Sequence, residues 1–110
     1  MPVINERNLS VTANTKFLTS DIKSASPDGW LVITIIPAAA GKLTVVHDDG
    51  TNEDEGILND DTNLKAGSEY SFNVPCPTST TNTTSLVQES INFKFSVTTT
   101  LTKLIITEGA

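Results

Sequence analysis

Apolar and polar residues alternate with a period of two in two segments of this 110-residue chain, residues 70–76 and 91–97. Such alternation is typical of β-strands that bury one face. No segment combines helical periodicity with helix-forming residues over the roughly 10–12 positions that a stable helix needs. The pattern therefore predicts an all-β protein. The positions predicted to face the core are Tyr70, Phe72, Val74 and Cys76 in the first segment and Ile91, Phe93, Phe95 and Val97 in the second.

Shorter apolar segments separated by turn residues extend this prediction to the rest of the chain. Seven or eight short strands at roughly ten-residue spacing are typical of a β-sandwich or barrel. A chain of this length builds one domain around one two-layer core. Further strands are expected near 9–13, 30–36, 42–47, 51–58 and 101–107, with a weaker apolar cluster at 16–23 and residues 98–100 as a connection.

The domain organisation follows from the segments between these strands. Residues 1–7 are expected to form an irregular N-terminal arm, and residues 8–110 a single β-sandwich domain with a long Thr/Ser-rich surface loop at 77–90. The long crossover favours a jelly-roll arrangement of antiparallel strands over an immunoglobulin-like one, which would usually place a core Trp between two cysteines. Two turns are predicted, at Pro27-Asp28-Gly29, with Gly29 taking the positive φ, and at Asp49-Gly50.

The strand at 30–36 is apolar on both of its faces. A strand in a two-layer sandwich normally presents one face to solvent, so a neighbouring subunit is expected to cover the second face. We expect Trp30, Val32 and Ile36 to lie nearest that contact, with Trp30 as a lid on the core. Val3 and Ile4 in the arm could reach a neighbour by strand addition.

The charge of the chain limits its partners. The formal net charge is −6 and the seven basic residues are scattered singly. Binding to nucleic acid or to an anionic membrane surface requires clustered Lys and Arg, so neither partner is expected. Residues 1–20 lack the features of a secretion signal, and no stretch approaches a membrane span. The protein is expected to be made and kept in the cytoplasm, or to have lost a leader by processing.

Residues that could support catalysis are few. Nucleophilic catalysis needs a nucleophile, a base and a group that orients the base. Cys76 lies between two prolines at an inward position, where a buried small apolar role is favoured, and His47 is the single histidine. A zinc ligand set is not available. We therefore expect no enzyme activity, no catalytic residue and no cofactor or metal.

Two features leave a ligand-binding alternative open. The segment 48–61 concentrates seven carboxylates, and calcium takes six to eight oxygen ligands. Its glycine and acids have the wrong offsets for an EF-hand, and an acidic hairpin also keeps an edge strand from pairing with other chains. Trp30 is the other feature, since an exposed aromatic could contact carbohydrate. A calcium-dependent or carbohydrate-binding module is thus the alternative to a structural role.

Four segments in the second half of the chain carry a resemblance to a known class of proteins: residues 56–59, 64–74, 90–96 and 104–108. They resemble small β-sandwich virion proteins of tailed phages and related viruses, such as capsid decoration or cement proteins. The resemblance implies a non-enzymatic protein of the virion, made in the host cytoplasm, that binds copies of itself or the major capsid protein. Decorating or cementing a capsid, or forming a small virion appendage, is the leading hypothesis. A subunit of an extracellular filament joined by strand donation is a further alternative.

Overall fold

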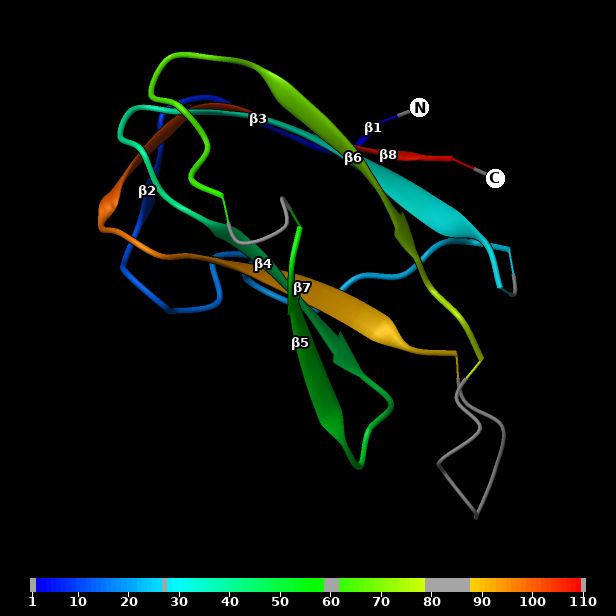
Figure 1. Ribbon diagram of the computed structural model, residues 1–110. Helices are drawn as coiled ribbons and strands as arrows, with labels where there is room; N and C mark the ends of the chain where they lie inside the picture. The colour runs from blue at the N-terminus through cyan, green and yellow to red at the C-terminus, as the bar shows by residue number, and fades with distance from the viewer. Residues whose placement is uncertain (1, 27, 59–61, 79–87, 110) are drawn as a thin grey trace.

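Two antiparallel sheets pack face to face in the computed structural model, which describes residues 2–26, 28–58, 62–78 and 88–109 (Figure 1). The eight strands are β1 (Pro2–Glu6), β2 (Leu9–Val11), β3 (Trp30–Pro37), β4 (Leu43–Asp48), β5 (Glu53–Ile57), β6 (Tyr70–Pro75), β7 (Ser90–Phe95) and β8 (Thr99–Glu108). The five-stranded sheet has the order β1-β8-β3-β6 with β2 also paired to β8, and the three-stranded sheet has the order β5-β4-β7. The predicted all-β sandwich is confirmed.

The strand pairs are nested along the chain. β1 and β2 pair with β8, β3 pairs with β6, and β4 pairs with β5. In chain order, residues 16–22 fall between β2 and β3, and they lie along β7 through bridges from Lys16 to Lys94 and from Ile22 to Ile91. The chain is therefore one long hairpin that is rolled into two sheets, with its tip between β4 and β5.

Alternate residues of the central strands fill the space between the sheets, as the period-two pattern predicts. Leu31, Ile33 and Ile35 of β3 have no exposed surface, and the same holds for Phe93 and Phe95 of β7. On the edge strand β6 the alternate residues are less buried toward its start, where Tyr70 and Phe72 are only partly covered. The remaining core residues are Val11, Leu18, Leu43, Val45, Leu64, Val74, Cys76, Ile91, Leu101, Leu104 and Ile106.

The two predicted turns form, but one differs in detail. At the hairpin tip, the Asp49 carboxylate accepts hydrogen bonds from the backbone N–H of Thr51 and of Asn52, at 2.8 and 2.7 Å, and Gly50 has a φ of 90°. In the other turn the positive φ belongs to Asp28, at 56°, and not to the glycine that follows it. A short side chain that bonds to nearby backbone groups tolerates this conformation.

The bounds of three segments differ from the sequence prediction or lie partly outside the described residues. The N-terminal segment is not an irregular arm, because residues 2–6 form β1 and pair with β8. β8 begins at Thr99, inside the predicted connection. Most of the predicted surface loop, residues 79–87, lies outside the described residues, while Thr78 and Gln88 at its base form a bridge.

Candidate interaction surfaces

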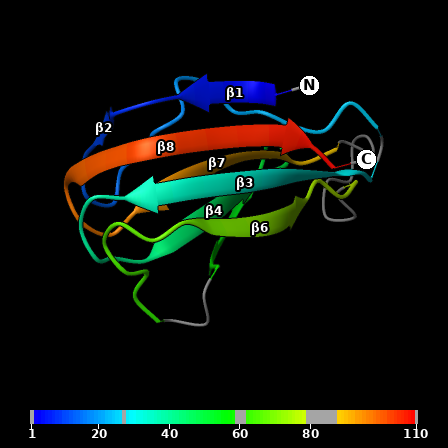
Figure 2. The ribbon, with the colours of Figure 1, turned by 90° about the horizontal axis from the view of Figure 1, so that it is seen from above.

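The outer face of the five-stranded sheet carries the first candidate surface. Figure 2 looks down on this sheet, with β8, β3 and β6 toward the viewer. Its apolar residues, which we call the apolar row, are Trp30, Val32 and Ile36 of β3 and Ile105 of β8. They project outward because their neighbours in each strand are the fully buried core residues.

Polar neighbours keep the apolar row partly covered. Val32 lies between Asn73 of β6 and Thr107 of β8, and Ile36 lies beside Lys103. Lys103 is held by an ion pair with Glu69 at 2.6 Å. Val32, Ile36 and Ile105 are therefore half-buried within the isolated chain.

Trp30 does not form the expected lid on the core. The residue is 40% exposed, and it lies on the outer side of the sheet. The indole covers the backbone of Gly109, where any side chain would collide with the ring, and Gly109 N–H donates a 2.9 Å hydrogen bond to the Trp30 carbonyl. The ring thus packs over Gly109, just after the end of β8, while part of the residue stays exposed to solvent.

The residues predicted to share an interface do not all lie on one face. Trp30, Val32 and Ile36 do share the outer face of β3. Ile4 is opposite the fully buried Ile106 and packs against the core, so it lies on the inner face of the same sheet. Val3 belongs to β1, but its side chain lies outside the described residues.

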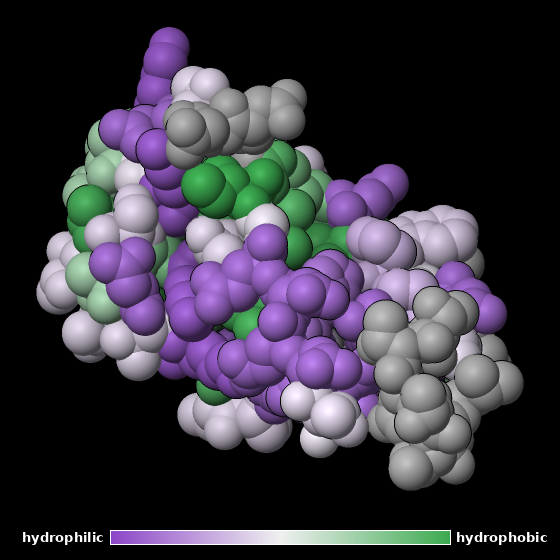
Figure 3. Space-filling model, turned by 60° about the horizontal axis from the view of Figure 1, so that its bottom comes forward, coloured by the Kyte–Doolittle hydropathy of each residue, from purple (hydrophilic) through white to green (hydrophobic). Residues whose placement is uncertain are grey.

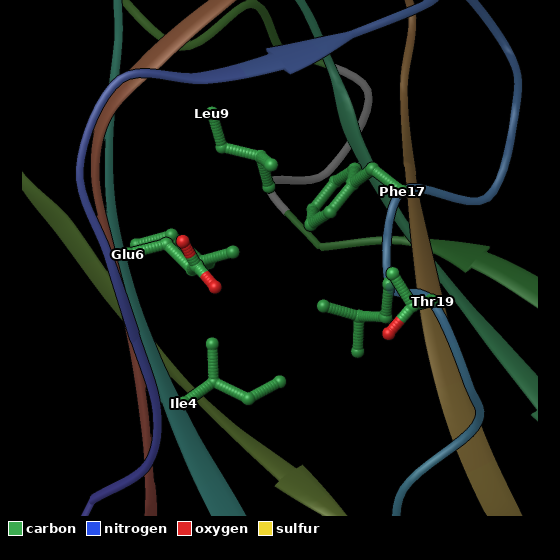
Figure 4. Close-up of a pocket in the computed structure, with 7 residues that line it drawn as sticks. Ile4, Glu6, Leu9, Phe17 and Thr19 are labelled. Carbon is green, nitrogen blue, oxygen red and sulfur yellow. The ribbon is translucent and has the colours of Figure 1, made fainter.

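A hollow of about 120 Å³ lies under β1, between this strand and residues 17–19. Figure 4 shows Ile4, Glu6 and Leu9 on one side and Phe17 and Thr19 on the other. Glu6 lies opposite the buried Leu104 and so occupies an inward position, although its side chain is exposed. The inner side of β1 therefore borders this hollow as well as the core, against which Ile4 packs. The full lining is Ile4, Glu6, Leu9, Phe17, Leu18, Thr19 and Leu104.

The acidic hairpin is tied to lysines of the neighbouring elements. Glu53 accepts from Lys16 Nζ at 2.6 Å and Glu55 from Lys94 Nζ at 2.9 Å. The hydrogen bond to Glu53 raises the pKa of Lys16 above its ordinary value, and the nearby negative charges add to this effect. Figure 3 brings this side of the molecule forward and shows that hydrophilic side chains cover much of it.

These contacts leave little support for the calcium alternative. Asp49 is buried and bonds to the hairpin turn, while Glu53 and Glu55 form ion pairs. In the described part of the chain, no group of three or more His, Cys, Asp and Glu side chains could hold a metal ion. Asp60 and Asp61, at the end of the predicted acidic segment, lie outside that part.

His47 and Cys76 do not form a hydrogen bond with each other in the part of the chain that the structure describes. Cys76 is fully buried, and its Sγ accepts a 3.4 Å hydrogen bond from Ser24 N–H. His47 is opposite the buried Ile91, and its Nδ1 is buried without a hydrogen-bond partner in that part of the structure. These contacts match the expected structural role of Cys76.

One residue with an important structural role was not predicted. Asn92 lies at an outward position of β7, yet only 3% of it is exposed. Its Oδ1 accepts from Leu18 N–H at 3.1 Å and from Phe93 N–H at 2.8 Å, and its Nδ2 donates to Asp21 Oδ1 at 2.9 Å. Asn92 thereby fixes the 16–22 segment along β7. Its position in the alternating pattern is polar and gives no sign of this burial.

Comparison with known proteins gives no relative. No protein-family model, no curated protein and no solved structure matches this chain. The described residues contain no helix of the length and hydropathy needed to cross a membrane.

Proposed function

We propose that this protein is a non-enzymatic structural protein of a virion, which associates with itself and decorates or cements a capsid or forms a small appendage. The nested strand pairing supports the proposal because it follows the scheme of a jelly roll, with residues 16–22 in place of one full strand. Jelly rolls build viral capsid domains and also lectins. Since one fold can carry many functions, the function has to be inferred from a feature of the surface.

The apolar row on the outer face of the five-stranded sheet is the observation that carries the proposal. Sheets with one solvated face usually alternate apolar and polar residues, whereas β3 has Trp30, Val32 and Ile36 on its outer side. Covering these side chains with a second subunit would remove apolar surface from water, which favours association. Trp and large aliphatic residues are typical of the buried centre of such interfaces.

Sedimentation of Val32→Asp, compared with wild type and Thr51→Asp, tests self-association. Both variants add one negative charge, but Thr51 lies exposed at the hairpin tip of the other sheet. A charge buried without a partner in the interface should weaken association about a hundredfold, and the control should leave it unchanged. A wild type that stays monomeric at high concentration, or equal association of both variants, would contradict the proposal.

The virion assignment needs a separate measurement. Purified particles from cells that produce the protein should contain it in a fixed ratio to the major capsid protein, as measured by quantitative mass spectrometry. Recovery in cell-surface filaments instead would favour the filament alternative.

The second candidate function is that of a carbohydrate-binding module, and the observation that favours it is the partial exposure of Trp30. Sugars that stack on an indole change its fluorescence, and this chain has a single Trp. A saturable change with a glycan, lost in Trp30→Ala, would support this candidate over the structural role.

A further inference from the structure

We propose that β1 is an exchangeable strand, which leaves its own sheet and pairs with β8 of a second copy of this chain. The inference rests on the proposed self-association and names a route for it. Exchange of an identical element between subunits is a low-cost way to form a dimer, because every contact of the closed monomer is made again in the dimer.

The inner contacts of β1 are incomplete. Ile4 is only half-buried, and the next inward residue is Glu6, an exposed carboxylate with no hydrogen bond or ion pair among the described residues. Beneath them lies the hollow of about 120 Å³. Among its described side chains, β1 thus has none that is fully buried, and its detachment removes little packing from the core.

The position of β1 also favours its exchange. It is the edge strand of its sheet and is joined by backbone hydrogen bonds to β8 alone. When it leaves, the edge of β8 presents unpaired backbone groups and the inner side chains Leu104 and Ile106. The segment that fits this edge in sequence and register is another β1, so the occupant is a second copy.

The hinge for this movement is at Arg7 and Asn8, which are both exposed. Asn8 has a φ of 56°, and its N–H makes a long hydrogen bond of 3.4 Å to the Thr102 carbonyl. Asn tolerates the left-handed region better than most residues do, but without the freedom of glycine it is still less stable there than in an extended conformation. Opening the hinge to an extended form relieves this strain once in each subunit of the dimer.

Disulfide trapping between β1 and β8 tests the exchange. Asn5 and Ile105 are direct cross-strand partners on the outer side of the sheet, at a separation that suits a disulfide. The Asn5→Cys and Ile105→Cys single variants are mixed, unfolded and refolded together, and then oxidised. Exchange yields a covalent heterodimer that joins position 5 of one chain to position 105 of the other, as identified by peptide mass spectrometry. Each variant oxidised alone is the control for random collision.

Two hinge variants complete the test. Asn8→Pro cannot hold a positive φ, so it should raise the heterodimer yield roughly tenfold. Asn8→Gly holds that φ without strain and should lower the yield while it keeps the fold. Heterodimer no more abundant than in the controls, or equal yields from both hinge variants, would overturn the exchange.

The result also separates the exchange from the proposed function. An oligomer that Val32→Asp disrupts, but that gives no position 5 to position 105 disulfide, overturns the exchange and leaves the proposed function intact. A chain that is monomeric under all conditions overturns both.

Discussion

The long strand β8 has β3 on one side and β1 on the other, and the two neighbours bury different side chains. Ile106 lies between Ile33 of β3 and Ile4 of β1, and one step along the inner face Leu104 lies between Ile35 and Glu6. The β3 residues have no exposed surface, whereas Glu6 is exposed over a hollow. Both strands complete a backbone ladder, so the difference in their contribution to stability comes from the apolar surface that each removes from water.

The largest expected effect is the difference in stability between two single Ile→Ala variants, one in each strand that flanks Ile106. Ile33→Ala leaves a cavity in packed core and should lower the free energy of unfolding by about 3 kcal/mol. Ile4→Ala removes a half-buried side chain beside an existing hollow, so about 1 kcal/mol is expected. Urea denaturation followed by fluorescence measures both. Equal losses would mean that β1 is as tightly packed as β3.

A smaller effect should follow from filling the hollow. Glu6→Leu places an apolar side chain at an inward position and should raise the free energy of unfolding by about 1 kcal/mol. Glu6→Gln is the matched control, because it removes the charge without adding apolar surface and should change stability little. If Leu stabilises no more than Gln, the hollow does not account for the weak packing of β1.

The smallest effect concerns the turn that leads into β3. The backbone N–H of Thr78 donates a 2.6 Å hydrogen bond to Asp28 Oδ1, and this bond lowers the pKa of Asp28 below its ordinary value. The folded state therefore gains stability from Asp28 above the ordinary pKa of an aspartate and loses it as the pH falls through the lowered pKa. Asp28→Asn retains an acceptor and tolerates the positive φ, but it cannot titrate.

The measurement for this turn is the melting temperature as a function of pH. Between about pH 4 and pH 2 the melting temperature of Asp28→Asn should fall less steeply than that of wild type. The two should run parallel between pH 5 and pH 7. If the melting temperature of Asp28→Asn falls as steeply as that of wild type in the acid range, the hydrogen bond to Thr78 does not stabilise the folded state in solution.

The contrast between β3 and β1 also explains which elements could be predicted from the sequence. In β7 the alternation predicts the inward positions, and the structure confirms that Ile91, Phe93 and Phe95 are buried. In β6 it holds for Val74, whereas Tyr70 and Phe72 nearer the start of this edge strand are only partly covered. β1 could not be predicted because its inward positions hold Ile4 and then Glu6, which breaks the alternation. Its strand conformation depends on β8, about a hundred residues later in the chain, and no local pattern contains that information.

The candidate interface could be predicted in part, for the same reason. Residues 30–36 are apolar on both faces, so the outward position of Val32 and Ile36 followed from the strand period. Trp30 was expected over the core, but as the first residue of β3 it shares their outward side. The burial of Asn92 could not be predicted, because it arises from the segment 16–22 that lies against it.

The nested strand pairing has a consequence for how the chain reaches this structure. The β4–β5 hairpin joins residues close in sequence and can form early, whereas β1 pairs with β8 from Pro2 to Thr107, so the sheet cannot close until the last strand is available. Topologies dominated by such distant pairings fold slowly, in milliseconds to seconds. During synthesis on the ribosome, β1 is made before its partner β8, so its backbone groups stay unpaired until β8 has been made.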